Sequence, residues 1–152
     1  MRQHRRVRCV ALYYRRIYDC KMQRYAKNSG AVFSLKYHIV WCPKYRRSVL
    51  TKPVDRRLKR LLQQKAGELG MTIHMLEVMP DHVHLFLESD PTLGVAEIVN
   101  RLKGFTSHQR REEFPFLRSR LPTLGSRRYY AGSVGSVSEA VVRKYIESQK
   151  GK

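Results

Sequence analysis

The sequence predicts an α+β domain with a ferredoxin-like antiparallel sheet, helices on one face of that sheet and an extra C-terminal helix. The order of the elements is the main observation, because the hydrophobic periodicity gives strand, helix, strand, strand, helix, strand and a final helix. A length of 152 residues and an apolar share of 42% fit one folded domain. The chain is also strongly basic, with 31 Lys and Arg against 12 acidic residues, which indicates a polyanionic partner.

Nucleic acid and an anionic membrane are the two polyanions to consider. No apolar run has transmembrane length, and no basic amphipathic helix carries aromatics on its apolar side, so nucleic acid is favoured and no membrane association is expected. Basic residues interrupt the apolar stretches at the N-terminus, so no signal peptide is predicted. Cys9, Cys20 and Cys42 are odd in number and form no CxxC pair, which favours reduced thiols in a cytoplasm.

Residues 1–28 are interpreted as a basic N-terminal extension, and residues 29–152 as the functional domain. The extension holds nine Lys or Arg and a single acidic residue, Asp19. A disordered arm that contacts nucleic acid and a misplaced translation start explain this composition equally well. Residues 10–18 could form a short helix, although they show no clear apolar stripe.

The first predicted strand runs from Phe33 to Trp41, where apolar residues alternate with mostly polar ones. His38 falls on the polar side, which allows it a place on the same sheet face as the histidine pair described below; an ordinary surface histidine is the favoured interpretation. Pro43 ends the strand. The loop Lys44–Arg47 then places an aromatic among basic residues, a composition that suits phosphate contact and base stacking and that a solvated loop also has.

A helix is predicted over Val54–Leu69, with Gly70 as its C-terminal cap. Met71–Met79 is the second strand, and a turn at Pro80 and Asp81 joins it to a third strand that starts at His82. Because strand residues two apart share a face, His82, His84, Phe86 and Glu88 are expected on one side, which a sheet of this type leaves open. The residues between them can pack into the core.

The second helix is predicted over Val95–Glu113. Its buried stripe comprises Val95, Ile98, Val99, Leu102 and Phe105, and its exposed side comprises Arg101, Lys103, Arg110 and Arg111. Residues 114–126 are expected to be irregular, and Arg127–Ala131 to form a short basic strand. Gly132–Gly135 is predicted to be a flexible joint. Ser136 then opens the last helix with a capping box completed by Glu139.

Two histidines on a rigid strand form a possible pair of metal ligands. An isolated His-x-His is more often a half-exposed strand surface, and zinc is disfavoured because no Cys pair or third His stands at zinc spacing. On the last helix, Val141, Tyr145 and Gln149 lie along one stripe. Taken alone, such a tyrosine is more often a half-buried packing residue, and such a glutamine is more often solvated. A divalent ion held by two imidazoles and an amide oxygen could activate a phosphate, and a tyrosine hydroxyl could attack it.

Four segments in order, Tyr37–Arg47, Met79–Glu88, Arg101–Ser107 and Val141–Gln149, resemble the single-tyrosine HUH transposases of the insertion-sequence-200-like family. The resemblance covers about residues 30–149. It implies a ferredoxin-like homodimer that binds hairpins in single-stranded DNA at transposon ends, and in which the tail helix can be exchanged between subunits. It also implies cleavage with Mg²⁺ or Mn²⁺ and no small-molecule cofactor, leaving a 5′-phosphotyrosine and a free 3′-OH.

By position, Tyr145 matches the family's nucleophile, and His82, His84 and Gln149 match its metal ligands. The residues expected to contact DNA are Lys36, Lys44, Arg46, Arg47, Arg101, Lys103, Arg127 and Arg128. Two departures are visible: Gly125 stands where the family usually has a tryptophan before its last strand, and the N-terminal extension exceeds the family's usual start. The alternative hypotheses are a domesticated relative acting on repeated extragenic palindromes and a single-strand nucleic-acid-binding module without chemistry.

Overall fold

The computed structural model describes residues 26–121 and 123–151. They fall into two units, and the boundary between the units lies after Ser34. In the first unit, β1 (Ala26–Lys27) and β2 (Val32–Phe33) form a small antiparallel ribbon. The predictions for Cys9, Cys20, the helix over residues 10–18 and most of the basic extension lie outside the described residues.

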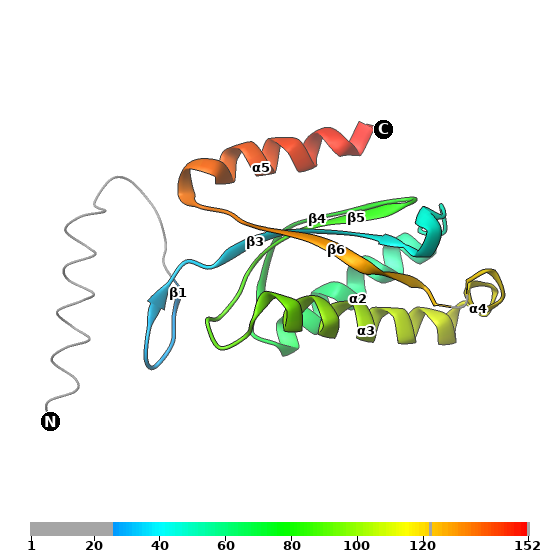
Figure 1. The fold of residues 1–152 in the computed structure, drawn as a ribbon, viewed down its shortest axis with the longest axis horizontal. Helices are drawn as coiled ribbons and strands as arrows, with labels where there is room; N and C mark the ends of the chain where they lie inside the picture. The colour runs from blue at the N-terminus through cyan, green and yellow to red at the C-terminus, as the bar shows by residue number, and fades with distance from the viewer. Residues whose placement is uncertain (1–25, 122, 152) are drawn as a thin grey trace, which may run out of the picture. The chain divides into compact units, whose positions relative to one another are not determined.

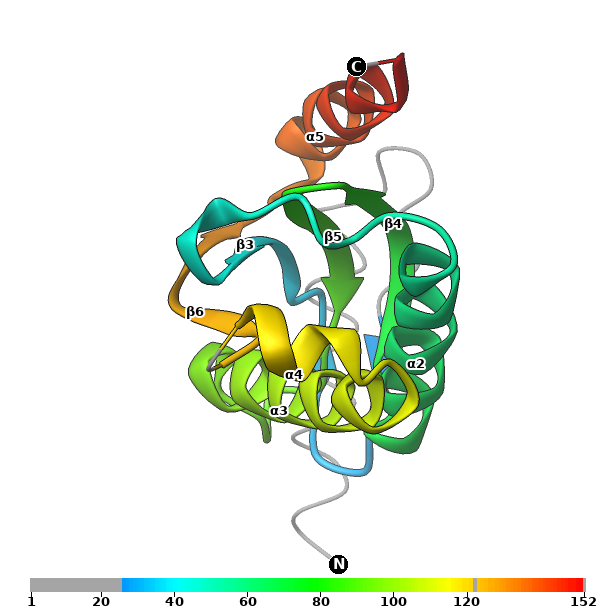
Figure 2. The same cartoon turned by 90° about the vertical axis from the view of Figure 1, so that its right-hand side faces the viewer.

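The second unit is built on a four-stranded antiparallel sheet in the order β4-β5-β3-β6, which confirms the predicted ferredoxin-like architecture. Its strands are β3 (Lys36–Pro43), β4 (Thr72–Met79), β5 (His82–Glu88) and β6 (Gly125–Ser133). The helices α2 (Val54–Glu68), α3 (Val95–Glu113) and α4 (Phe116–Arg120) lie on one face, and α5 (Ser136–Ser148) lies on the other (Figures 1 and 2).

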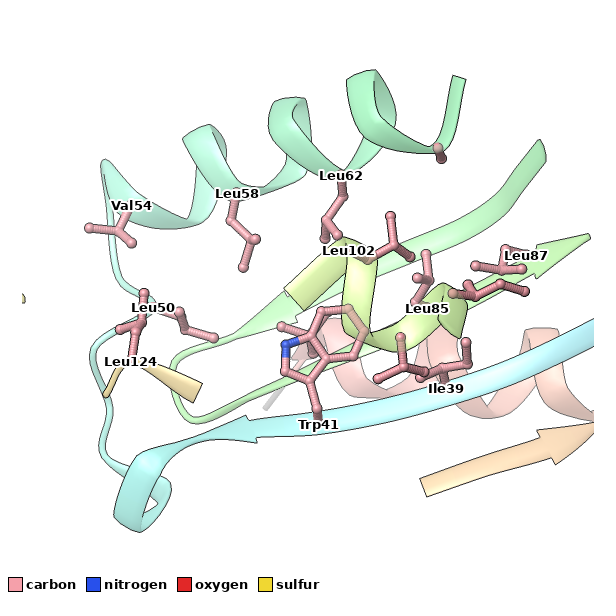
Figure 3. Close-up of a cluster of buried hydrophobic side chains, with 14 of the residues drawn as sticks. Ile39, Trp41, Leu50, Val54, Leu58, Leu62, Leu85, Leu87, Leu102 and Leu124 are labelled. Carbon is pink, nitrogen blue, oxygen red and sulfur yellow. The ribbon is translucent and has the colours of Figure 1, made fainter. Parts of the chain in front are cut away.

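The main core lies between the sheet and the helices α2 and α3 (Figure 3). Ile39 and Trp41 of β3 project into it, as their alternation predicts, and Leu85 is fully buried beside them. Leu58 and Leu62 enter it from the α2 stripe. Each fully buried aliphatic side chain contributes about 1.5–3 kcal/mol, so this cluster is the main source of stability.

A β-bulge in β4 sets the register between β4 and β5, the strand that contains His82 and His84. Ile73 pairs with Leu87 and Met75 with Phe86, so His74 is the extra residue. Ile73 and Leu76 are three residues apart, and the bulge lets both pack against the main core. Beyond the bulge, Glu77 stands across from His84.

The two short turns around α2 and β4 form as the sequence predicts. Gly70 ends α2 with a positive φ of 68°, and Met71 donates its backbone N–H to the carbonyl of Ala66. Pro80 and Asp81 form the hairpin turn, and Met79 pairs with His82 at its base. This tight turn fixes the start of β5, at His82, next to the edge strand β4.

Several boundaries differ from the prediction. The strand expected over residues 33–41 is interrupted, because Phe33 ends β2 and β3 begins at Lys36. The segment 114–126, expected to be irregular, contains α4, which follows Pro115 and buries Leu117 against the core. Proline is suited to a helix start because its missing N–H is not needed there.

The predicted flexible joint is wrong for its first half. Gly132 and Ser133 belong to β6 and pair with His38 and Tyr37. Val134 is buried, and its N–H donates to the carbonyl of Lys36. β6 is therefore longer than predicted at both ends, and it leads directly into α5.

The predicted capping box at the start of α5 is also wrong. Gly135 is the N-cap of this helix, and the helix itself begins at Ser136. Glu139 extends its carboxylate to Lys36 of β3 and to Arg143 one turn later. Glu139 therefore fastens α5 to the sheet instead of closing its N-terminus.

The exposed side of α3 contains a further correction. Arg110 was expected on the surface, yet it is only 4% exposed, and burial lowers its pKa to about 10. Its Nε donates to the backbone carbonyl of Thr106. Thr106 is one of the buried residues of α3, whereas Phe105, which was predicted to be buried, is not. In the described part of the chain, no helix is both long and apolar enough to cross a membrane.

Candidate active site

The α5-facing side of the sheet gathers three histidines and two tyrosines. They are His82 and His84 of β5, His38 of β3, Tyr130 of β6 and Tyr145 of α5. The Tyr145 ring meets the His84 ring edge-on, with 5.5 Å between the two centroids. Four elements that are distant in sequence therefore build one cluster, which we call the histidine–tyrosine cluster.

His84 is the most buried member of this cluster, with 3% of its surface exposed. Its Nδ1 lies 3.2 Å from Nε2 of His38, within hydrogen-bond distance. Burial, helped by the nearby imidazoles of His82 and His38 and opposed by Glu77, lowers the pKa of His84 to about 4. His84 is therefore neutral near pH 7, which is the form that binds metal ions.

His82 is held by the turn residue that precedes it. Its Nδ1 lies 2.5 Å from Oδ1 of Asp81, and Oδ2 of Asp81 accepts a hydrogen bond of 2.9 Å from Nε of Arg46. Burial alone would raise the pKa of Asp81, but the hydrogen bonds from His82 and Arg46 outweigh it and lower that pKa. The ionised carboxylate therefore fixes the His82 ring with its Nδ1 proton toward Asp81.

The tail helix is attached to the sheet by an apolar cluster and by charge. Ile146 is fully buried against Phe86 and Val134. Lys36 and Glu139 form a salt bridge of 2.6 Å near one end of α5. These contacts position Tyr145, the residue before Ile146, over the histidines while leaving its side of the helix half exposed.

The C-terminal end of the helix reaches the same strand pair. Gln149 begins the short turn η2 (Gln149–Gly151), and Lys150 beside it lies 3.4 Å from a carboxylate oxygen of Glu77. Glu77 stands across from His84. Gln149, the third predicted ligand, is therefore on a segment that touches the histidine region, and its side-chain amide lies 3.5 Å from Ser148 Oγ.

The donor set fits a divalent metal ion. Among the described residues, the hydrogen bonds of both histidines run through Nδ1, so Nε2 of His82 and of His84 remain as ligand nitrogens. Across the same residues, no three His, Cys, Asp or Glu side chains are grouped to hold a metal. A metal at this place would depend on the two imidazoles together with a different oxygen donor, such as the amide of Gln149.

Two expectations about this face of the sheet are wrong. His38 is not an ordinary surface histidine, because it is 9% exposed and contacts His84. The face is also not open along its whole length, because Phe86 is fully buried beneath α5. An exposed aromatic platform for bases is therefore not formed by Phe86.

The basic residues predicted to contact DNA have different environments. Lys36, Arg46 and Lys103 are engaged within the protein, by Glu139, by Asp81 and by the carbonyl of Ser126, respectively. Lys103 was expected on the exposed side of α3, but it is half-buried and its pKa is lowered by burial. Lys44 is half-buried, and the exposed predicted contacts are Arg46, Arg47, Arg101, Arg127 and Arg128. Of these, Arg47 donates to the carbonyl of Arg120, and Arg101 donates to the carboxylate of Glu97.

Lys103 also packs beside Gly125 at the start of β6. A Cβ at Gly125 would lie 3.6 Å from Cε of Lys103, so the lysine stem occupies the space beside this glycine. The preceding residue, Leu124, is 2% exposed in the main core. The start of β6 is therefore packed by Lys103 and Leu124.

Sequence reasoning missed three contributors to the site. Asp81 was assigned only to a turn, although its place directly before His82 is a usable signal. Glu77 was not singled out, although the predicted hairpin turn places it across from His84. Tyr130 gave no signal, because it reaches His38 only through the pairing of β6 with β3, which are distant in the sequence. The loop containing Tyr45 and Arg46, both with positive φ, is also tied to the site through Asp81.

A family model described as "Transposase IS200 like" matches residues 31–149. This match spans the sheet, its helices and the tail helix that bears Tyr145. The fold and the matched region define the class as tyrosine transposase. The chain belongs to the IS200-like transposase family.

Two relatives illustrate how close the similarity is. The ISDra2 transposase TnpA of Deinococcus radiodurans is 38% identical over 128 residues, which cover 83% of this chain and 91% of the relative. The transposase for insertion sequence element IS200 of Salmonella typhimurium is 31% identical over 119 residues, covering 77% of this chain and 78% of the relative.

Solved structures agree with the fold. A crystal structure of a candidate transposase from Deinococcus radiodurans R1 has a TM-score of 0.68 at 35% identity, covering 82% of this chain and 97% of the other. A REP-associated tyrosine transposase bound to a REP hairpin has a TM-score of 0.56 at 13% identity, covering 84% of this chain and 67% of the other. The second similarity concerns the fold alone.

Proposed function

We propose that this protein is a DNA transposase that cleaves and rejoins single-stranded DNA at hairpin-bearing transposon ends, through a 5′-phosphotyrosine at Tyr145. The observation that carries the proposal is the edge-on approach of the Tyr145 ring to His84, with 5.5 Å between centroids. Family membership supports the class of reaction, and this contact supports Tyr145 as the nucleophile. A phenol beside the neutral imidazole of His84 suits attack on a phosphodiester that a metal ion polarises.

The proposed metal is Mg²⁺ or Mn²⁺, held by Nε2 of His82 and of His84 and by the side-chain oxygen of Gln149. Two imidazoles and one amide leave positions for water and phosphate oxygen. Such an ion, when bound, supplies Lewis-acid charge that offsets the negative charge of the transition state. The support for this donor set is that Asp81 and His38 already occupy the two Nδ1 atoms.

The chain's own chemistry in this proposal is carried by Tyr145. Its hydroxyl loses a proton, and Oη forms a bond to phosphorus while the bond from phosphorus to the 3′ oxygen breaks. The 3′ oxygen takes up a proton and leaves as a free 3′-OH. The reverse attack by a 3′-OH on the phosphotyrosine rejoins DNA and restores the phenol, so the phosphodiester energy is kept and no nucleotide cofactor is needed.

Single-stranded DNA with hairpins is the proposed partner. The net charge of +19 supports it, as do the exposed Arg127 and Arg128 on β6 and the exposed Tyr45 beside Lys44. A protein of the same fold is bound to a REP hairpin. Binding should weaken with salt, with a slope of about −0.7 per phosphate contacted on single strands; binding that ignores salt would contradict phosphate contact by these residues.

A homodimer with exchanged tail helices is part of the proposal. In the single chain, α5 lies on its own sheet, so the cluster is complete within one subunit. Exchange would bring the same contacts together from two chains. Mixing the inactive variants His84→Ala and Tyr145→Phe tests it: adduct formation in the mixture supports exchange, whereas a mixture as inactive as its parts supports assembly within one chain.

A matched pair of tyrosine variants tests the proposal. Tyr145→Phe should abolish a denaturant-resistant adduct with a hairpin oligonucleotide in the presence of Mn²⁺, while keeping hairpin binding. Tyr130→Phe is the control, because Tyr130 belongs to the same cluster and is also exposed. An adduct that survives in Tyr145→Phe and disappears in Tyr130→Phe would reassign the nucleophile. A wild-type protein that binds DNA without any adduct would leave a binding module.

A further inference from the structure

His38 belongs to the histidine–tyrosine cluster, but the proposed mechanism gives it no role as a metal ligand or as the nucleophile. It lies on β3, and its Nε2 is 3.2 Å from Nδ1 of His84. We infer that His38 is a positioning residue, which holds the ring and the proton of His84 so that Nε2 of His84 is the ligand nitrogen. This inference rests on the proposed metal-dependent function.

The argument begins with the proton shared by the two rings. A neutral imidazole has one N–H and one lone pair. If His84 binds a metal through Nε2, its proton must be on Nδ1, and that Nδ1–H donates to Nε2 of His38. His38 must then carry its own proton on Nδ1. In that arrangement the contact with His38 holds the His84 tautomer that has a ligand lone pair on Nε2, whereas donation from Nε2–H of His38 would leave the His84 proton on Nε2.

The position of His38 is itself fixed by its surroundings. In the sheet it stands across from Phe86 on one side and from Gly132 on the other. Its ring is nearly parallel to that of His84, at 12°, and the ring of Tyr130 meets it edge-on at 5.9 Å. A Cβ at Gly132 would lie 2.5 Å from Oη of Tyr130, so a side chain at this position would displace the phenol from its present place. His38 is therefore held on several sides.

The two candidate ligands are held by equivalent contacts from different elements. Asp81 accepts from Nδ1 of His82, and His38 takes the same place for His84. A carboxylate fixes the tautomer through its charge, whereas an imidazole acts only while its Nε2 carries a lone pair. Removal of such an outer contact typically weakens metal binding about 10–100-fold.

The test compares His38→Ala with a matched control, His74→Ala. His74 lies in the neighbouring strand β4 and its contacts are with Glu88 and Phe86, away from the pair. The first measurement is the ¹⁵N shift pattern of His84 in the metal-free protein. Wild type and His74→Ala should show the Nδ1–H tautomer, and His38→Ala should lose it.

The second measurement is the affinity for Mn²⁺ alone, followed by electron paramagnetic resonance. We expect about a 10–100-fold loss in His38→Ala and less than a twofold change in His74→Ala. Fluorescence of Trp41, the single tryptophan in the chain, checks folding. If His38→Ala does not fold, His38→Gln and His38→Leu replace it. The glutamine amide can accept the hydrogen bond from His84, so His38→Gln should retain more Mn²⁺ affinity than His38→Leu.

Mn²⁺ affinity within twofold of wild type in His38→Ala, or in His38→Leu where the alanine variant does not fold, overturns the inference. A wild-type protein that binds no Mn²⁺ would refute the proposed metal site, and the ¹⁵N pattern would then decide the role of His38 by itself. An unchanged His84 tautomer in the variant would refute that role as well.

Discussion

Truncation of Ile146 should release the tail helix without unfolding the domain. Ile146 is fully buried in a small cluster with Phe86 and Val134, and Val142 packs beside them. This cluster is separate from the main core that contains Trp41. Ile146→Ala should therefore weaken the attachment of α5 to the sheet and leave the packing between the sheet and α2 intact.

The expected size follows from the burial. Replacing a buried isoleucine by alanine costs about 2–5 kcal/mol, and a site under a single helix, which can partly collapse, belongs at about 2–3 kcal/mol. Since each 1.4 kcal/mol is a factor of ten, the detached population of α5 should rise about 30- to 150-fold. Formation of the Tyr145 adduct should fall because the tyrosine spends less time at the histidines.

Native-state hydrogen exchange measures this change directly. Amides of α5 should lose protection by the factor given above, while amides of β3 keep theirs. Val141→Ala is the control on the same helix, since Val141 is 68% exposed and its truncation removes little buried surface. Unchanged α5 protection in Ile146→Ala, or equal losses in α5 and β3, would refute the separation of the two clusters.

Two further predictions concern the histidines. Because the pKa of His84 is lowered to about 4, between about pH 6.5 and 4 the unfolded chain binds a proton at this residue and the folded protein does not. The free energy of unfolding of the metal-free protein, measured with urea, should therefore fall as the pH is lowered through this window. The same dependence of stability on pH in His84→Gln would contradict the assignment. Asp81→Asn removes the charge that holds His82 and Arg46, so Mn²⁺ binding should weaken about 10–100-fold, whereas Asp55→Asn on the far helix should leave calorimetric Mn²⁺ titrations unchanged.

Local sequence patterns predicted most of the architecture. The alternation around Ile39 and Trp41 and the stripe of α2 marked which side chains enter the core, and the structure confirms both. Gly70 and the turn at Pro80 were predictable because each conformation has its own residue preference. These features depend on neighbours in the chain, which a single sequence displays.

The misses depend on contacts between distant segments. His38 was assigned to the surface because its place beside His84 follows from the register of β3 on β5, which periodicity does not reveal. Arg110 was placed outside because a charged residue is normally exposed, yet it is buried at the end of α3. Phe86 was expected on an open face because nothing local showed that α5 folds back over it.

The central claim is that the Tyr145 hydroxyl becomes covalently joined to DNA, and peptide mapping of the adduct tests it most directly. After reaction with a hairpin oligonucleotide and Mn²⁺, nuclease and trypsin should leave a nucleotide on the peptide 145–150, which starts at Tyr145 after cleavage at Lys144. Tyr130 falls in the separate tryptic peptide 129–143. A nucleotide on peptide 145–150 is the predicted result, and a nucleotide on peptide 129–143 instead would contradict the account.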